Sequence, residues 1–380
     1  MQNGMPGWLG ERSLWRWMIA VHLLFLFGIY HTQGIVLDKE ALKYSGGASD
    51  LLHGDLTDLM GRYKLFSAYI LFLVPFTALG SAAWAIPVQV LLMWTAALAM
   101  FRILRRLEVP APAANILTTV FLLAHPIQCW VLSLYSEAFF IPIVVLFLER
   151  SMRGRNFDAA TLSLALLVLF SRPTGVLFVL PVLVWWLSSR IPGSATTVRA
   201  GGVLAVLIAM AFTPVLNREQ LEVVVGSPVI CGFPEHPEVV DLFQGNTLAA
   251  AQGHVIAEHG LMYWAGLVLR RSVSLLVPYR SYFSPVHNGL VLLLALLYPL
   301  ALVGLWRAWK EPMVQVITVV LILNILLVGM TYDEWGARFL APLLPLVILL
   351  AATVWVPNRN IPSGLHSPSA ATVNRTSRRG

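Results

Sequence analysis

Long apolar runs, separated by short polar segments, make up most of the chain. A transmembrane helix needs about 20 apolar residues to cross the ~30 Å hydrocarbon core of a bilayer. Ten runs reach or approach this length, at residues 14–36, 83–103, 113–133, 137–149, 159–175, 175–188, 198–216, 288–306, 312–330 and 339–356. The pattern predicts an all-α polytopic membrane protein with about ten transmembrane helices.

An eleventh apolar run, at 65–80, is shorter and contains Pro75. If this run does not span, most of the chain's 26 basic residues fall on one side of the membrane, in clusters at 12–16, 102–106, 150–155, 190–199, 307–310 and 359–379. Most of the 19 acidic residues then fall on the other side. The positive-inside rule places both termini in the cytoplasm. We therefore expect the 65–80 run to be a juxtamembrane or re-entrant segment on the outer face, buried against protein.

Composition agrees with a multi-pass protein of the inner or plasma membrane. Hydrophobic residues make up 58% of the chain and charged residues only 12%, and the mean hydropathy is +0.74. In a typical soluble domain, roughly a quarter of all residues are charged. The net charge of +7 is explained by the cytoplasmic clusters, so it does not indicate a nucleic-acid partner. Two cysteines, Cys129 and Cys231, are too few for a metal site or a disulfide framework, and the sequence leaves open whether they pair.

The polar segments define the domain organisation. Residues 1–356 are expected to form one transmembrane domain with two large outer loops, at 37–82 and 217–287. Within the second loop, the segment 258–280 has an apolar, aromatic face and predicts an amphipathic helix lying on the outer interface. The tail at 357–380 is basic and rich in Pro, Ser and Asn, so we expect it to be cytoplasmic and disordered.

Candidate chemistry begins in the first outer loop. Asp38 and Glu40 directly follow the first apolar helix, and a carboxylate at the edge of a bilayer is costly unless it has a function. Such a group can act as a general base that removes a proton from an acceptor hydroxyl. The alternative is a solvated loop next to a helix end. His53 lies in the same polar stretch and is a substrate-binding candidate.

Three further candidates mark the outer ends of later helices. Glu137 begins the fourth predicted helix, where it either orients a substrate or a basic partner or simply favours the helix dipole. Arg172 interrupts the run between the fifth and sixth helices, and Arg338 begins the last one. An arginine can bind phosphate oxygens with two parallel hydrogen bonds. The alternatives are snorkelling to headgroups for Arg172 and a local ion pair with the nearby acids of 331–345 for Arg338.

Arginines in the second outer loop have two possible roles. Arg270 and Arg271, together with Arg280 and His287, either face anionic headgroups or hold the phosphate of a substrate. No pattern of His, Cys and Asp has zinc spacing, and the sequence has no glycine-rich phosphate loop and no serine nucleophile motif. We therefore expect no metal site and no cofactor, although a divalent metal between the acidic pair and a phosphate is an option that we do not favour.

Several short motifs, in their order along the chain, resemble those of one enzyme superfamily. They are Asp38-Lys39-Glu40 followed by Tyr44, Ala48 and Leu51-Leu52, then Arg105-Arg106-Leu107, His125-Pro126, Ser136-Glu137, Arg172-Pro173-Thr174-Gly175, and Arg338-Phe339 with Pro342 and Pro345. Their order resembles the GT-C superfamily of integral-membrane glycosyltransferases, in particular the branch of the protein O-mannosyltransferases and aminoarabinose transferases.

The resemblance implies a function. In that family the first outer loop carries the catalytic Asp or Glu, and the donor is a sugar on a polyprenyl or dolichyl phosphate, used at the outer face. Asp38 would then be the general base and Glu40 its neighbour, while Arg172, Arg270, Arg271 and Arg338 are candidates for binding the lipid phosphate. A base on one face of the sugar and a leaving group on the other gives inversion. The acceptor would be a glycan, lipid or protein, and the active site would face outward among membrane lipids.

Two other classes stay open at this stage. A polyprenyl-linked polysaccharide polymerase or ligase would also have outer arginines and a large outer loop. A lipid or solute transporter would show charged or broken helices at mid-membrane and a repeated half. The sequence does not identify the sugar, the acceptor, the prenyl carrier or the oligomeric state.

Overall fold

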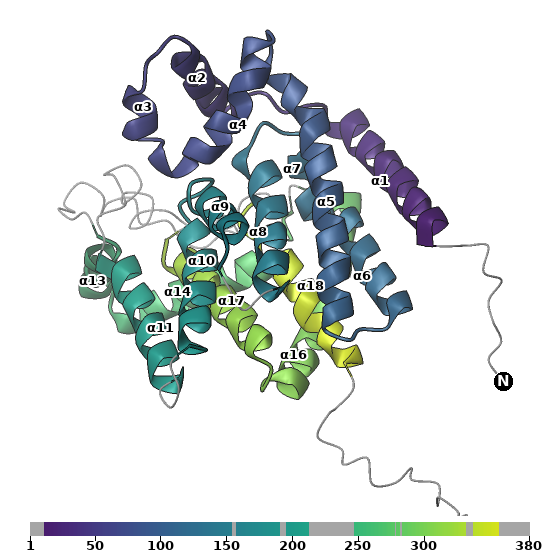
Figure 1. The fold of residues 1–380 in the computed structure, drawn as a ribbon. Helices are drawn as coiled ribbons and strands as arrows, with labels where there is room; N and C mark the ends of the chain where they lie inside the picture. The colour runs from purple at the N-terminus through teal and green to yellow at the C-terminus, as the bar shows by residue number, and fades with distance from the viewer. Residues whose placement is uncertain are drawn as a thin grey trace, which may run out of the picture.

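The computed structural model describes residues 11–153, 157–190, 195–212, 247–277, 279–281, 283–331 and 337–356. The regular secondary structure of these ranges is helical, apart from an isolated β-bridge between Val36 and Ser133. The helices of the N-terminal half are α1 (Glu11–Gln33), α2 (Glu40–Leu52), α3 (Thr57–Met60), η1 (Lys64–Phe66), α4 (Ser67–Ala78), η2 (Ala82–Trp84), α5 (Ala85–Arg106), α6 (Ala111–Leu123), α7 (His125–Val131), α8 (Ser136–Arg153) and α9 (Ala159–Leu169). The later helices are α10 (Gly175–Ser188), α11 (Ala195–Phe212), α13 (Leu248–His259), α14 (Leu261–Leu276), α15 (Pro285–Leu294), α16 (Leu297–Ala308), α17 (Pro312–Thr331), α18 (Leu344–Ala352) and η4 (Thr353–Trp355). The predicted all-α class is confirmed for the part of the chain described here (Figure 1).

Fewer helices than ten are long and apolar enough to cross a membrane. Four helical segments meet both conditions: Ser13–Gln33, Ala82–Arg106, Pro285–Ala308 and Pro312–Thr331. A fifth is reached only if α6 and α7, which meet at a bend of 52°, count as one broken span. The structure therefore supports an α-helical membrane protein, but with four or five such spans among the described residues. The run at 65–80 forms only the short helices η1 and α4, in agreement with the expectation that it does not span.

The shortfall has a local physical cause, because proline and glycine divide apolar runs that hydropathy alone joins. Ala124 has an extended backbone between α6 and α7. Pro126 lies in the first turn of α7, a position where proline commonly begins a new helix. Pro173 disfavours a helical conformation at Arg172, and α9 accordingly ends at Leu169. These breaks place polar residues at helix ends, where they can meet.

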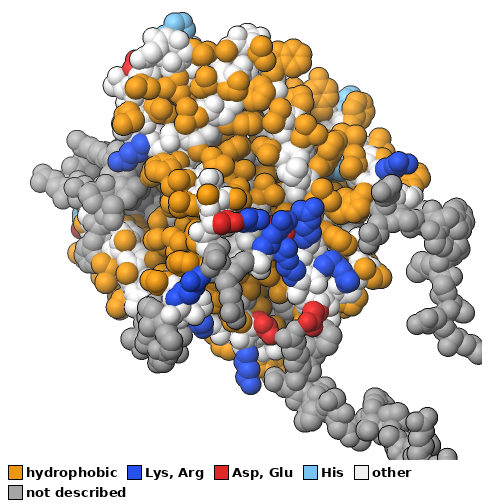
Figure 2. Space-filling model, viewed as in Figure 1, with side chains coloured by type: hydrophobic (Ala, Val, Ile, Leu, Met, Phe, Trp, Pro, Cys, Tyr) orange, Lys and Arg blue, Asp and Glu red, His pale blue; other side chains and the backbone are white. Residues whose placement is uncertain are grey.

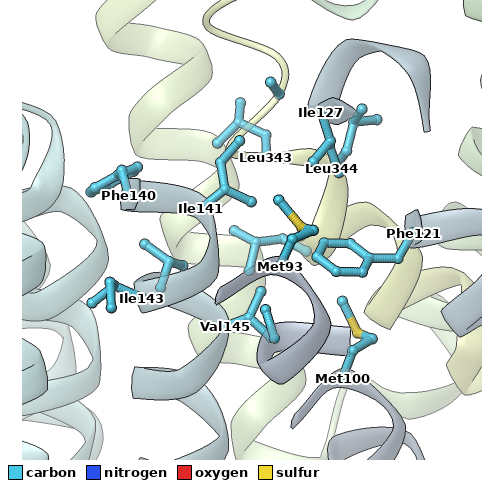
Figure 3. Close-up of a cluster of buried hydrophobic side chains, with 14 of the residues drawn as sticks. Met93, Met100, Phe121, Ile127, Phe140, Ile141, Ile143, Val145, Leu343 and Leu344 are labelled. Carbon is cyan, nitrogen blue, oxygen red and sulfur yellow. The ribbon is translucent and has the colours of Figure 1, made fainter. Parts of the chain in front are cut away.

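The helices pack around one main apolar core. Figure 3 shows its centre, where Met93 and Met100 of α5 lie against Phe121 of α6, Ile141 of α8 and Leu344 of α18. In Figure 1, α2 and α4 cover one end of the bundle, and α1 lies at its side. Helices α5 and α8 pack against each other, as do α10 and α11, and α16 and α18.

The outer surface is largely apolar. Figure 2 shows hydrophobic side chains over most of one face, with Lys and Arg gathered in a limited region. Only 22% of the most apolar stretch of α1 is buried within the protein, and Trp17, Leu24 and Phe27 are among its exposed side chains. Extended exposed apolar surface marks a site of contact with membrane or protein, which agrees with helices that face lipid.

The second outer loop differs from its expected form. Its amphipathic segment forms α14, which follows α13 after a break at Gly260, and α14 packs along α17. Arg271 is only 1% exposed, and Arg280 is buried as well, so the prediction that both face headgroups is wrong. The amphipathic pattern fits this packing equally well, because it identifies an apolar face without saying what covers it. Two predicted segments lie outside the described residues: the central part of the 217–287 loop, including Cys231, and the 357–380 tail. Cys129 has a buried, free thiol.

Small residues allow α16 and α18 to approach closely. Ala301, Gly304 and Ala308 lie on the buried face of α16. A Cβ atom at Gly304 would overlap the carbonyl oxygen of Leu350 on α18. Membrane helices commonly use small residues for such close approach.

We predict that Gly304→Ala destabilises the protein. The added methyl group must displace α18, and overpacking of this kind typically costs about 1–3 kcal/mol. Gly289→Ala is the matched control, because Gly289 is also helical and a Cβ atom there would have nothing within 4 Å. Unfolding in detergent should show a lower free energy of unfolding for Gly304→Ala and no loss for the control. Equal stability of the two variants would contradict the close packing of α16 on α18.

Candidate functional site: a carboxylate–arginine cluster

Two helices begin side by side because the segments before them are hydrogen-bonded. The backbone N–H of Val36 donates to the carbonyl of Leu132 at 3.1 Å, and the N–H of Leu134 donates to the carbonyl of Val36 at 3.1 Å. This parallel bridge fixes the segment that leads into α2 next to the segment that leads into α8. Glu40 is the first residue of α2 and Glu137 the second residue of α8, so both carboxylates lie at the same end of the bundle.

Glu137 is the centre of the cluster. Its side chain is completely buried. Its Oε1 atom forms an ion pair with Arg172 Nη1 at 2.9 Å and accepts a hydrogen bond from Arg338 Nε. The hydroxyl of Ser136 lies 3.4 Å from the second oxygen, Oε2. A carboxylate removed from water is tolerated only when it is paired and hydrogen-bonded, and Glu137 has both kinds of partner.

Arg338 connects the two carboxylates. Its Nη2 atom lies 3.2 Å from Glu40 Oε2 while Nε is bonded to Glu137, and its guanidinium lies over the ring of Tyr135 at 5.3 Å from the centroid. The five N–H donors of arginine, in a rigid fork, suit such a bridge. The start of α2, the start of α8 and the turn before α18 are thus held together by one side chain.

Arg172 lies deeper in the protein. Its side chain is only 5% exposed, and its guanidinium lies 5.8 Å and 5.9 Å from the ring centroids of Phe140 and Phe339. It therefore does not snorkel to headgroups, the alternative considered for it above. Its ion pair with Glu137 makes it part of the internal support of the cluster.

Glu40 has a mixed environment at the edge of the cluster. Tyr44 donates a hydrogen bond to Glu40 Oε2 at 3.1 Å, and Lys43 Nζ lies 3.7 Å from the same oxygen. Partial burial acts to raise the pKa of Glu40, but the charges of Arg338 and Lys43 and the hydrogen bonds from Arg338 and Tyr44 outweigh it, so this pKa lies below its ordinary value. Burial lowers the pKa of Lys43, although Glu40 opposes that effect. Glu40 is consequently held as an anion by two cations.

The cluster has an excess of positive charge and reaches the surface at two cations. Among the described residues, Arg172, Arg338 and Lys43 pair with two carboxylates, those of Glu137 and Glu40. The side chains of Lys43 and Arg338 are 24% and 14% exposed, whereas Arg172 is sealed inside. An anionic ligand can therefore contact Lys43 and Arg338 and be attracted by the net charge of the group.

Asp38 provides a second type of group beside this cluster. It lies two residues before Glu40 and is exposed, and its backbone carbonyl accepts a hydrogen bond from the N–H of Ala41 at 2.9 Å. Its carboxylate forms no ion pair or hydrogen bond with any other described side chain. The pKa of Tyr135 is raised by burial first, against the effect of Arg338, and the charges of Asp38 and Glu40 add to this rise. Asp38 is therefore close enough to the cluster to influence it electrostatically.

The structure brings together five of the eight residues predicted from the sequence. Asp38, Glu40, Glu137, Arg172 and Arg338 lie at one end of the bundle.

The other three predicted residues lie elsewhere. His53 follows the last residue of α2, where its Nδ1 atom is 2.8 Å from the carbonyl of Ser49. At 1.5 Å per residue this is about 20 Å along the helix from Glu40. Arg270 and Arg271 are on α14, exposed and buried respectively, and neither is among the ion-pair partners of Glu40 or Glu137.

Two polar residues of the cluster were not predicted as site residues. Lys43 and Tyr44 lie three and four positions after Glu40 on the same helix. Residues at this spacing share one face, so their position relative to Glu40 is a signal that the sequence does contain. The position of Tyr135 beneath Arg338 has no comparable signal, because it depends on a contact between segments 203 residues apart.

Comparison with known proteins identifies no relative of this chain. No family model, no curated protein and no solved structure matches it. Within the described ranges, no three His, Cys, Asp or Glu side chains gather in the way a metal site requires. The geometry of the carboxylate–arginine cluster is therefore the basis for any functional conclusion.

We predict that Glu137→Gln strongly destabilises the protein. The substitution leaves the buried Arg172 without its described charged partner and leaves Arg338 paired with Glu40 alone, and breaking a buried ion pair in this way costs about 3–5 kcal/mol. The measurement is the free energy of unfolding in mixed detergent micelles.

Glu149→Gln is the matched control at the other end of α8. Glu149 is also buried and paired with two arginines, Arg106 and Arg153, but these are 35% and 37% exposed. After the substitution they can turn to water or headgroups, so we expect a smaller loss, of about 1 kcal/mol. If the two variants lose the same free energy, Glu137 does not have the special structural role described above.

Proposed function

We propose that the chain is a GT-C-type integral-membrane glycosyltransferase that moves a sugar from a polyprenyl-phosphate donor to an acceptor hydroxyl at the outer face of the membrane. The observation that carries the proposal is the exposed carboxylate of Asp38, on a segment that the Val36 bridge fixes beside a cluster whose described side chains carry three positive and two negative charges. The reaction needs these two kinds of group, a base and a set of cations, at neighbouring positions.

The chemistry assigns the base. The acceptor oxygen attacks the anomeric carbon of the donor sugar, its proton passes to a base, and the bond to the phosphate oxygen breaks with its electron pair on the phosphate. Glu40 is engaged by Arg338, Lys43 and Tyr44, which weakens it as a base. Asp38 has no such partner among the described residues, so we assign proton removal to Asp38 and the positioning of the cations to Glu40.

The cations serve the leaving group. Negative charge develops on the lipid phosphate as the glycosidic bond breaks, and fixed positive groups stabilise it most when they need no rearrangement. Lys43 and Arg338 are the two cluster cations that reach the surface. Glu137 and Arg172 hold Arg338 in place from below, so we assign them positioning roles. Attack opposite the phosphate gives inversion at the sugar.

The membrane arrangement is part of the proposal. Four shorter apolar helices, Ala159–Leu169, Gly175–Ser188, Arg199–Met210 and Leu344–Trp355, and helix α8 accompany the longer spans. Together they would give about ten membrane-embedded helices of GT-C type. Arg150 and Arg153 lie in the last turn of α8 and Glu137 in its first, and they are about 20 Å and about 24 Å from Glu137 along the axis. The positive-inside rule then favours cytoplasmic termini and an outward-facing site in the inner or plasma membrane.

One observation favours a second candidate, the transport of a lipid-linked or anionic solute. Helices α6 and α7 meet at a bend of 52°, and transporters often bind their substrates at broken helices. We prefer the transferase because α7 leads directly into the Leu132–Leu134 segment of the bridge. The bend therefore also serves to build the carboxylate–arginine cluster.

The test is sugar transfer by the purified protein, reconstituted in vesicles, from a panel of polyprenyl-phosphate sugars to membrane extracts. We predict that Asp38→Asn lowers the rate of transfer by about 10²–10⁴-fold, the usual contribution of a general base. Asp50→Asn is the control, because Asp50 is also an exposed acid of this loop, on α2, and we assign it no role. Full activity of Asp38→Asn would exclude Asp38 as the base. Movement of the donor across the vesicle membrane without transfer would support the second candidate.

A further inference from the structure

A separate cavity lies at the other end of the bundle, between α10, α11 and α17. Its volume is about 290 Å³, and its lining is mainly apolar, with Trp185, Val203, Val206, Val319 and Leu323. Figure 1 shows the three helices side by side, and α10 packs against both of the others. Gly202 also lines the cavity, and a Cβ atom there would overlap Val184 on α10, so the close approach of α10 and α11 requires glycine at this position.

One cation of the cavity lining has no acidic partner. Arg199 donates from Nε to Ser188 Oγ at 3.0 Å and from Nη1 to Gln315 Oε1 at 3.1 Å. Both partners are neutral, and no described carboxylate forms an ion pair with Arg199. The indole N–H of Trp185 is also buried and has no hydrogen-bond acceptor among the described residues. The cavity thus combines an apolar body with a positive charge and a free donor.

Its surroundings indicate where a ligand would come from. On α11, Leu204 and Ile208 are 57% and 51% exposed, so the outer side of this helix is apolar and suits contact with lipid. The volume is near the lower limit of about 300 Å³ for pockets that hold small organic molecules. It accommodates one apolar chain and not a complete lipid with two chains.

We propose that this cavity binds one acyl chain of an anionic phospholipid from the adjacent leaflet, with the lipid phosphate bound to Arg199. The apolar lining holds the chain by van der Waals packing, and the guanidinium, which has no described acidic partner, selects an anionic headgroup. The site is distinct from the carboxylate–arginine cluster. Arg172 precedes α10, and Trp185 lies ten residues after Gly175, the first residue of that helix, which is about 15 Å along its axis, so the proposal does not depend on the transferase function.

Photolabelling with two matched lipids tests the proposal. The protein is reconstituted in phosphatidylcholine vesicles that contain either phosphatidylglycerol or phosphatidylcholine with a diazirine on one acyl chain, and the labelled peptides are mapped by mass spectrometry. We expect several-fold more adducts on the cavity-lining residues of α10, α11 and α17 with the anionic probe. Arg199→Gln should remove this preference, whereas Lys310→Gln, a change of an exposed lysine at the same end of the bundle, should retain it.

A second variant separates the cavity from the surrounding lipid. Val319→Trp places a large side chain in the cavity and leaves Arg199 intact, and it should abolish the cavity adducts. Val203→Trp fills the same space from α11. This variant is used in place of Val319→Trp if Val319→Trp does not give a monodisperse protein. Equal labelling by both probes, or cavity labelling that survives both tryptophan substitutions, would overturn the proposal and indicate ordinary annular lipid. Labelling by a diazirine fatty acid and by neither phospholipid would overturn the choice of a phospholipid.

Discussion

The burial of the Glu137 carboxylate is the constraint on which the rest of the candidate site depends. Moving a carboxylate out of water costs several kcal/mol even after the protein relaxes. The charge is tolerated here because Arg172 and Arg338 supply two guanidiniums to the same oxygen. These arginines come from the turn between α9 and α10 and from the segment before α18. One carboxylate therefore fixes the relative positions of three parts of the chain.

The surface chemistry follows from this internal arrangement. Arg338 is held by Glu137 on one side and extends to Glu40 on the other. Glu40 in turn holds Lys43, which lies over the ring of Phe66 at 4.0 Å from its centroid. A buried network in which each member has a partner is rigid, so the two cations that reach the surface are oriented before any ligand binds. Asp38 lies next to them on a segment that the Val36 bridge also fixes.

Much of this site could be predicted from the sequence, because isolated charges in very apolar segments are conspicuous. Glu137, Arg172 and Arg338 were identified for that reason, and the structure places them in contact. Their partners could not be predicted, since Glu137 and Arg338 are 201 residues apart and no local pattern reports such a contact. The sequence therefore suggested phosphate as the partner of Arg172, whereas its described partner is Glu137.

The fold was predictable at the level of class and less so at the level of helices. Mean hydropathy distinguishes an apolar helical protein from a soluble one, but it does not register where a single residue such as Ala124 leaves the helical conformation. For this reason fewer than ten of the predicted spans are, among the described residues, single helices long enough to cross a membrane. The burial of Arg271 on α14 was missed for a related reason: an amphipathic pattern shows that one face is apolar, and only the tertiary structure shows whether lipid or another helix covers it.

The most direct test of the account is a double-mutant cycle between Glu137 and Arg338, measured by the free energy of unfolding. The single variants Glu137→Gln and Arg338→Gln are compared with the double variant. The account predicts strong coupling, up to about 3 kcal/mol, because removal of Arg338 relieves part of the unpaired charge that Glu137→Gln creates. Additive losses, with no coupling between the two positions, would contradict the claim that this ion pair organises the site.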